Sequence, residues 1–264
     1  EASEFKRRGY LLALNEQIGQ KVAAKMGILD RLRECEVPLT ENVMYDTSGK
    51  KLMRFNLDHK TLNERVGLML NRADLQATLY DAVKNDVQFL MGQEITGITS
   101  ADNGLEVTFS NKKKQIYDLV IGADGIHSKT RELIFGGGFE RHMGYAYFAF
   151  MTKNREMAFR LKEHEIKIMR GDGFTIAYHR LKHDEIGAYI FHKEKKLKHV
   201  APNERRDYML RKYGKYDQNF RVVLKEIKSD EFIFHDGFTQ IVMPTWYKDR
   251  VCLIGDAASC PTPA

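Results

Sequence analysis

The stretch that decides the fold is Asp118-Leu119-Val120-Ile121-Gly122-Ala123-Asp124-Gly125-Ile126-His127-Ser128-Lys129-Thr130-Arg131. It begins as a short, continuous apolar run, which is typical of a strand buried on both faces of a parallel sheet. The run ends in a turn at Asp124-Gly125, and the residues from Ser128 to Ile134 favour a helix. The stretch therefore predicts a strand, a turn and a helix, with an acidic side chain at the carboxyl end of the strand.

A second segment near the end of the chain has the same arrangement. It is the apolar run Arg250-Val251-Cys252-Leu253-Ile254 followed by Gly255-Asp256-Ala257-Ala258. Ligands of open α/β folds bind at the carboxyl ends of parallel strands, where small residues allow close approach of the backbone. A carboxylate there can accept hydrogen bonds from the hydroxyl groups of a neutral polyol. Either segment alone is compatible with a core strand that ends in a turn, but the two together indicate a ligand-binding edge.

The rest of the chain is predicted to alternate between these α/β segments and a β-rich insertion. One α/β domain is expected from residues 1–140 and 241–264, interrupted by a domain of antiparallel sheet and helices at 141–240. Apolar spacing predicts helices at 15–34, 74–83 and 203–227. It also predicts strands within 41–71, at 87–90, 240–243 and 251–254, and an antiparallel sheet over 141–192. An Asn-Gly turn predicts a hairpin that joins 94–100 to 105–109.

The composition is that of an ordinary globular protein. The chain has 264 residues, of which 43% are hydrophobic, 30% charged and 11% aromatic, which excludes disorder. Its net charge of +6 comes from scattered basic residues, with short runs at 112–114 and 192–196 that are typical of hairpin tips. The sequence thus predicts no nucleic-acid partner and no integral membrane segment. The surplus charge would suit an anionic cofactor.

The cysteines predict a reducing compartment. Cys35, Cys252 and Cys260 follow no regular spacing, so we expect neither disulfides nor a zinc site, and a cytoplasmic location. His179 and His183 are four residues apart, but their segment is predicted as strand and loop, so no metal site is expected. Met and Phe residues across 143–176 are interpreted as core or pocket lining.

The two acidic segments resemble the FAD-dependent aromatic hydroxylases with the p-hydroxybenzoate hydroxylase fold. The signature D-x-x-x-G-A-D-G-x-x-S-x-x-R is matched from Asp118 to Arg131, and R-x-x-L-x-G-D-A-A from Arg250 to Ala258. The resemblance implies an α/β fold, in which an FAD-binding dinucleotide (Rossmann-like) domain carries an inserted, sheet-rich substrate domain. It also implies that Gly255-Asp256 binds the ribityl chain of FAD, and that Asp124-Gly125 lies near the pyrophosphate and serves both FAD and NADPH.

Shorter matches extend this implied cofactor site. The segment Leu70–Leu75 resembles the family's L-x-R-x-x-L, whose arginine, here Arg72, contacts FAD. Glu1-(x5)-Arg7-x-Gly9 resembles the segment whose acid holds the adenosine ribose, and Pro263 matches the start of the family's P-x-x-G-x-G segment beside the flavin ring. Ser259 stands where the family usually has histidine. The family's G-x-G-x-x-G loop is absent, so we expect a chain truncated at both ends that binds FAD weakly by itself.

The activity implied by the resemblance is monooxygenation. In such enzymes NADPH or NADH reduces FAD, O2 adds at flavin C4a, and the hydroperoxide transfers one oxygen atom to an aromatic, phenolic or polyketide-like substrate. No side-chain nucleophile is needed, so no catalytic residue is predicted, and a monomer is expected. Among subgroups, the chain most resembles the tetracycline-inactivating monooxygenases, which would make it an antibiotic-resistance protein. The residues that carry this are Ile126-His127-Ser128, Thr239-Gln240-Ile241, Trp246 and Cys260-Pro261-x-Pro263.

Two other classes of protein stay open. A flavoprotein reductase or halogenase could share the fold, although halogenases typically carry a W-x-W-x-I-P segment and this chain has a single tryptophan, Trp246. A protein that keeps the fold and binds a flavin or another ligand without turnover is the remaining alternative.

Overall fold

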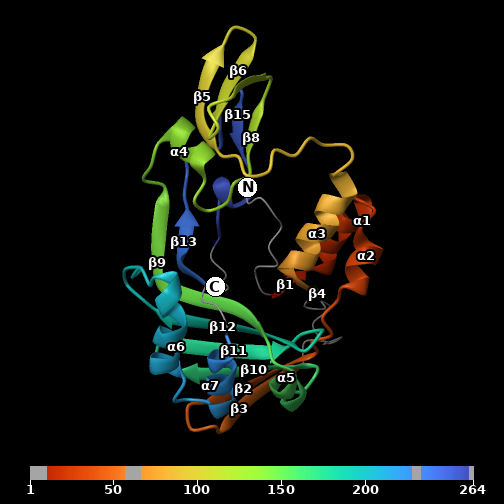
Figure 1. Cartoon of the computed structure of the whole chain (residues 1–264), viewed down its shortest axis with the longest axis vertical. Helices are drawn as coiled ribbons and strands as arrows, with labels where there is room; N and C mark the ends of the chain where they lie inside the picture. Colours follow the sequence, from red (N-terminus) through yellow and green to blue (C-terminus); the bar gives the residue numbers. More distant parts are fainter. Residues whose placement is uncertain (1–10, 57–66, 228–232, 262–264) are drawn as a thin grey trace.

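The computed structural model describes residues 11–56, 67–227 and 233–261. A large sheet with its covering helices forms one end of the molecule, two small sheets form the other, and a helical unit lies to one side (Figure 1). The described residues include no helix long and apolar enough to span a membrane.

The large sheet has seven strands in the order β13-β9-β12-β11-β10-β2-β3. All neighbouring pairs are antiparallel except β10 and β2. The strands are β2 (Glu41–Asp46), β3 (Lys51–Asn56), β9 (Glu140–Lys153), β10 (Glu165–Gly171), β11 (Phe174–Arg180), β12 (Glu185–Lys193) and β13 (Phe234–Ile241). The antiparallel sheet predicted over 141–192 is confirmed. However, β2 and β3 also belong to it, although the predicted boundaries assign them to the α/β domain.

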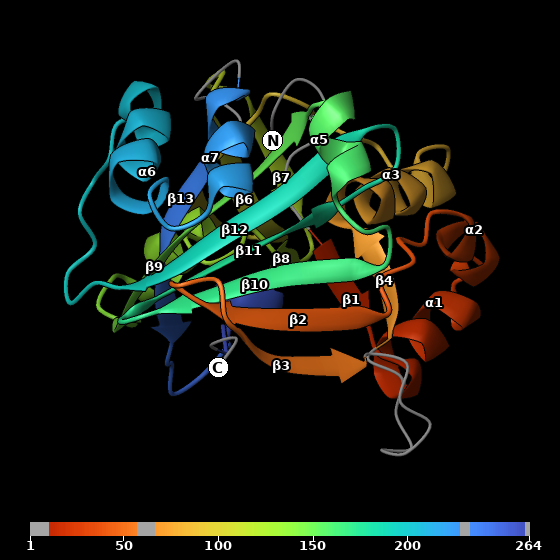
Figure 2. The same cartoon turned by 90° about the horizontal axis from the view of Figure 1, so that it is seen from below.

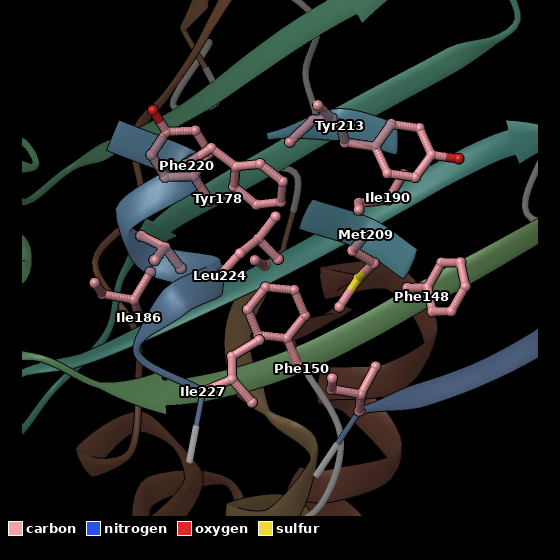
Figure 3. Close-up of a cluster of buried hydrophobic side chains, with 14 of the residues drawn as sticks. Phe148, Phe150, Tyr178, Ile186, Ile190, Met209, Tyr213, Phe220, Leu224 and Ile227 are labelled. Atoms are coloured by element: carbon pink, nitrogen blue, oxygen red, sulfur yellow. The ribbon is translucent and has the colours of Figure 1, made fainter. Parts of the chain in front are cut away.

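Helices cover one face of this sheet and form the main core with it (Figure 2). They are α5 (Arg155–Arg160), α6 (Arg205–Tyr213) and α7 (Gln218–Lys225), and the last two confirm the prediction over 203–227. Figure 3 shows Phe148 and Phe150 of β9 among the buried side chains, together with Tyr178 of β11 and Phe220 of α7. Each large apolar side chain buried in this way contributes about 1.5–3 kcal/mol.

Side chains alternate between the two faces of the sheet, as the pleat of a strand requires. Phe148 and Phe150 are buried under the helices, whereas the intervening and flanking residues of β9, among them Tyr147, point to the opposite face. That opposite face is turned toward the rest of the molecule (Figure 1).

The two small sheets pack against each other. One contains β14 (Tyr247–Lys248), β15 (Val251–Leu253) and β8 (Val120–Gly122), and the other contains β5 (Ile95–Ala101), β6 (Gly104–Phe109) and β7 (Lys114–Tyr117). Leu105 and Val107 pack on Val120 and Val251. The prediction that β8 is buried on both faces is wrong, because Ile121 is 55% exposed. Among the described residues the hairpin sheet covers one face only.

The helical unit contains β1 (Leu11–Leu14), α1 (Lys21–Lys25), α2 (Leu29–Glu34), β4 (Leu68–Asn71) and α3 (Arg72–Val83). The helix predicted at 74–83 is confirmed, but the single helix predicted over 15–34 is wrong. A π turn at Glu16–Gln20 precedes α1, and Gly27, with a φ of 71°, separates α1 from α2. A left-handed backbone at this glycine ends the first helix.

Two local predictions also need correction. Residues 87–90 form no strand. The hairpin between β5 and β6 is present, but Ala101 pairs with Gly104, so the central turn residues are Asp102 and Asn103 rather than an Asn-Gly pair. The register is therefore set by the strand pairing and not by a glycine at the turn centre.

Candidate cofactor and substrate site

The two acidic segments meet at one edge of a sheet. Strands β8 and β15 are parallel neighbours, with Gly122 opposite Leu253, and the Ile254 N–H donates to the Gly122 carbonyl over 2.9 Å. The loops that begin at Asp124 and Gly255 therefore leave the same carboxyl edge side by side. Strand, turn and helix follow as predicted, since α4 (Lys129–Phe135) begins after the N-cap Ser128.

The glycines of these loops have two different roles. A Cβ on Gly122 would lie 2.6 Å from a side-chain carbon of Leu253 and 2.8 Å from one of Thr130, so this glycine allows β8, β15 and α4 to pack closely. Gly125 and Gly255 have φ values of 82° and 58°, and a Cβ on either would meet no atom within 4 Å. Their backbone thus borders open space at the edge, where a ligand can approach closely.

The two aspartates differ in what their carboxylates bind. Asp124 accepts hydrogen bonds from the Ser128 hydroxyl and from the Thr130 N–H, the latter over 2.9 Å. Burial raises the pKa of Asp124, but these hydrogen bonds outweigh it and hold the pKa below its usual value. This carboxylate therefore fixes the start of α4.

Asp256 is exposed and lies beside Cys260. Burial raises the pKa of the Cys260 thiol, and the charge of Asp256 and a hydrogen bond to it raise that pKa further. Among the described residues, the Cys260 thiol is the one partner of the Asp256 carboxylate. Asp256 consequently keeps acceptor capacity for hydroxyl groups of a ligand.

Arg131 joins the two loops and was not assigned a role from the sequence. Its side chain is 5% exposed, and its guanidinium donates to the carbonyl oxygens of Ile126, over 2.6 Å, and Ala257, over 3.1 Å. It also forms a 2.9 Å ion pair with Glu140 at the start of β9. One side chain thus connects both loops to the large sheet. The available signal was its fixed position at the end of the first signature.

The other predicted cofactor residues lie elsewhere or outside the described part. Arg72 is the exposed first residue of α3, whose N-cap Asn71 accepts from the Ala73 N–H over 3.0 Å. No contact among the described residues joins Arg72 to the edge formed by β8 and β15. Glu1, Arg7 and Pro263 fall outside the described residues.

An aromatic surface lies on the face of the large sheet opposite its helices. We use this term for Tyr145 and Tyr147 of β9, Phe191 of β12, and Phe234 and Phe238 of β13. Tyr147 contacts the rings of Phe191, Phe234 and Phe238 with centroid separations of 6.2, 5.3 and 5.3 Å. Tyr145 and Phe234 are 40% and 46% exposed, so part of the surface is accessible to a ligand. No sequence motif marks these positions.

The loop after β8 contacts the face of the large sheet that carries the aromatic surface. Asp236 lies opposite Tyr147 in the pairing of β13 with β9, and therefore on the same face. His127, in the loop after Gly125, approaches this carboxylate with 2.9 Å between Nε2 and Oδ2. The contact places the carboxyl edge of β8 next to the ring-lined face of the sheet.

Comparison with known proteins identifies the family. The FAD binding domain family matches residues 21–264. The chain belongs to this family. The resemblance inferred from the two signatures is thereby confirmed, as is the α/β fold with its FAD-binding domain and sheet-rich part.

Two of the relatives come from bacteria. A flavin-dependent monooxygenase of Legionella longbeachae is 28% identical over 260 residues, which are 93% of this chain and 63% of the relative. The 2-heptyl-3-hydroxy-4(1H)-quinolone synthase of Pseudomonas aeruginosa is 26% identical over 241 residues, 89% of this chain and 60% of that protein. The chain thus spans about 63% of the length of the former relative.

Solved structures share the fold. The tetracycline destructase Tet(51) superposes with a TM-score of 0.79 at 24% identity, covering 99% of this chain and 68% of that one. HpxO of Klebsiella pneumoniae, complexed with FAD and uric acid, has a TM-score of 0.77 at 20% identity, covering 97% of this chain and 65% of that one.

The residues at the edge fit FAD, the cofactor of the family. Gly125 and Gly255 border open space, and Asp256 offers an exposed carboxylate at the end of β15. A polyol chain needs such an acceptor, and a close backbone needs such glycines. The side chain of Asp124 fits the site less directly, because its acceptor atoms are already bound to Ser128 and Thr130.

Proposed function

We propose that this chain is the FAD-carrying part of a monooxygenase that places one oxygen atom of O2 on a small, planar aromatic, phenolic or polyketide-like molecule, with NADPH or NADH as the electron donor. The observation that carries the proposal is the contact of His127, in the loop after β8, with Asp236, which lies beside Tyr147 on the face that carries the aromatic surface. It brings a surface suited to flat rings next to the edge suited to FAD.

The chain's own residues would bind and orient the reactants. The chemistry that FAD supplies when bound is the activation of O2 with electrons from the nicotinamide. Asp256 would accept hydrogen bonds from the ribityl hydroxyls, with Gly255 allowing the close approach. The aromatic surface would stack against a planar substrate, and each offset pair of rings stabilises binding by about 0.5–1.5 kcal/mol. The stacked rings would also exclude water from the reacting carbon.

The proposed substrate class follows from the ring-lined face and agrees with the relatives. Among them are a quinolone synthase, a tetracycline destructase and a protein complexed with uric acid. Quinolones, tetracyclines and uric acid all contain flat, conjugated rings with oxygen substituents. Tetracyclines are therefore suitable first candidates, together with simple phenols and hydroxyquinolones.

The test uses the full-length protein that contains these residues. We expect it to purify yellow with about one FAD per chain, to oxidise NADPH or NADH faster when substrate is present, and to yield a product heavier by one oxygen atom. Phe191→Ala should raise KM for the substrate, whereas Phe159→Ala, an exposed aromatic residue on α5, should leave it unchanged.

Each alternative class gives a different result in this test. NAD(P)H oxidation that yields no oxygenated product with any candidate substrate would indicate a reductase. A halogenated product formed only when chloride or bromide is added would indicate a halogenase. A flavin-loaded protein with no NAD(P)H oxidation would indicate a binding protein, and a folded protein that takes up no FAD would contradict the proposal altogether.

A further inference from the structure

His127 has an unusual environment for an exposed side chain. Its own side chain is 65% exposed, but its Nε2 contacts the Asp236 carboxylate, which is only 15% exposed. The other carboxylate oxygen of Asp236 accepts the Gly237 N–H over 2.7 Å. Asp236 is therefore held from two sides, and the imidazole is oriented by a fixed acceptor.

The hydrogen bond to Asp236 determines which nitrogen of His127 can take up a proton. An ionised carboxylate can only accept, so Nε2 carries the hydrogen of this bond. In the neutral imidazole Nδ1 then holds the lone pair. In the part of the chain that the structure describes, no group forms a hydrogen bond with Nδ1. Nδ1 is thus a basic atom that is exposed and oriented by a carboxylate.

This basic atom lies at the border of the aromatic surface. Asp236 pairs across the strands with Tyr147, whose ring contacts Phe234 on one side and Phe238 on the other. A planar molecule stacked on these rings would have its edge substituents within reach of His127.

We propose that His127 accepts the proton of an acidic hydroxyl group, a phenol or an enol, of the planar substrate bound on the aromatic surface, and that Asp236 is its positioning residue. The inference rests on the proposed function and names a residue for it. In the step, the substrate O–H bond breaks, its electron pair stays on oxygen, and the proton forms an N–H bond at Nδ1. No electron is transferred to or from the substrate.

The step would prepare the substrate for oxygenation. A phenolate or enolate has more electron density on the carbon next to the C–O bond than the neutral form, and that carbon accepts the oxygen atom. The Asp236 carboxylate would stabilise the imidazolium that forms. An ordinary phenol has a pKa near that of tyrosine, about 10, against about 6.5 for imidazole. The substrates favoured by this pair are therefore acidic enols and phenols with electron-withdrawing groups.

Other charged groups near His127 belong to three elements. A cleft of about 400 Å³ is lined by His127 together with Arg131 and Glu132 of α4 and Glu140 of β9. Arg131 and Glu140 neutralise each other in an ion pair, and Asp124 in the same loop is bound to Ser128. Glu132 pairs with Lys129. Asp236 is therefore the charged group in direct contact with the imidazole.

The variant His127→Gln distinguishes uptake of a proton by Nδ1 from the hydrogen bond that Nε2 forms with Asp236. Its amide nitrogen can still donate to Asp236, but it has no basic atom in place of Nδ1. The probe is 4-nitrophenol, whose phenol and phenolate forms absorb differently, titrated into the FAD-loaded full-length protein across pH 5 to 8. We expect the wild type to bind the phenolate below the pKa of the free probe. His127→Gln should raise the pKa of the bound probe by about one unit. It should therefore weaken binding of the phenolate about tenfold at pH values above that pKa, and leave binding of the neutral phenol at lower pH unchanged.

Asp236→Asn should also raise the pKa of the bound probe. The amide can donate as well as accept, so it no longer fixes the hydrogen of His127 on Nε2. His199→Gln, a change of another exposed histidine, is the matched control and should leave it unchanged. The proposal would be overturned if the bound probe had the same pKa in His127→Gln as in the wild type, and only His127→Ala bound the probe more weakly. That result would show that His127 serves only to form the hydrogen bond with Asp236. Binding of the neutral phenol by the wild type, or loss of FAD from His127→Gln, would also overturn it.

The proposed function is tested by measurements that do not depend on this probe, namely NAD(P)H oxidation and the mass of the product. A shift of the bound probe's pKa in a protein that oxidises no NAD(P)H would contradict monooxygenation and still support His127 as the proton acceptor. Turnover with no effect of His127→Gln on the pH dependence of kcat would support monooxygenation and contradict the role of His127.

Discussion

Two aspartates that occupy the same place in their segments differ in environment. Asp124 uses its carboxylate to fix α4, through the Ser128 hydroxyl and the Thr130 N–H. Both side chains are exposed, but Asp256 has the Cys260 thiol beside it rather than donors of a helix start. The sequence predicted both as cofactor residues because both follow an apolar strand. It could not reveal that Asp124 is bound locally, since that depends on how tightly the turn brings Thr130 back toward the strand end.

The difference predicts that FAD affinity depends on Asp256. Asp256→Ala should weaken FAD binding to the full-length protein about ten- to a hundredfold, because a hydrogen bond to a charged group contributes about 1.5–3 kcal/mol. Flavin fluorescence during titration of the apoprotein measures it. Asp172→Ala, at the exposed turn between β10 and β11, is the control and should have no effect. Equal FAD affinity in both variants would mean that Asp256 is only a turn residue.

At the scale of elements, the sequence predicted those whose local signals agree. The helix at α3 has a buried Asn71 as N-cap, and α4 has Ser128, so both starts were recognisable. The segment 15–34 was predicted as one helix because apolar residues recur at helical spacing. In the structure Ile18, Val22 and Met26 are 67%, 51% and 48% exposed, so this stripe lies outside the core of the described residues. Periodicity alone could not show which apolar stripe finds a partner.

Arg131 is predicted to stabilise the joint between α4, the loop after β15 and β9. Arg131→Met should lower the free energy of unfolding by about 3 kcal/mol, because it leaves buried carbonyl oxygens without donors at about 1–3 kcal/mol each. Lys129→Met, which removes an exposed ion pair with Glu132 on the same helix, should cost less than about 0.5 kcal/mol. Denaturant unfolding of both variants measures this. Similar losses in the two would show that the bridging contacts of Arg131 add nothing.

At the scale of the whole molecule, sheet membership was the part least accessible to the sequence. Strand β2 pairs in parallel with β10, although more than a hundred residues separate them along the chain (Glu41 lies opposite Glu165). Such long-range pairing has no local signal. The aromatic surface was missed for the same reason, because Tyr147, Phe191 and Phe238 meet only when three strands are aligned. The parallel edge formed by β8 and β15 was predictable because each of its two strand–turn segments is continuous in the sequence.

Buried histidines link the stability of the whole fold to pH. His179 of β11 is 1% exposed, neither ring nitrogen has a partner among the described residues, and burial lowers its pKa to about 3. Burial also lowers the pKa of His235 to about 4, with the charge of Arg205 acting in the same direction. Both rings are neutral in the folded protein at neutral pH. Protonation of either would place a charge inside the large sheet or its core.

Protonation of His179 in the unfolded chain should therefore destabilise the protein already at pH values well above the pKa of about 3 that His179 has in the folded protein. The unfolded histidine has a pKa of about 6.5, so between pH 6.5 and 3 the unfolded chain binds the extra proton, and stability falls as pH falls through this window. At pH 5 this one group should cost about 2 kcal/mol relative to pH 7. His179→Met introduces an apolar, non-titratable side chain of similar size. It should remove this contribution to the loss of stability between pH 7 and pH 5, whereas His199→Gln should not. Urea unfolding at both pH values measures the difference. Identical pH dependence in the wild type and His179→Met would show that this ring becomes protonated without unfolding the sheet.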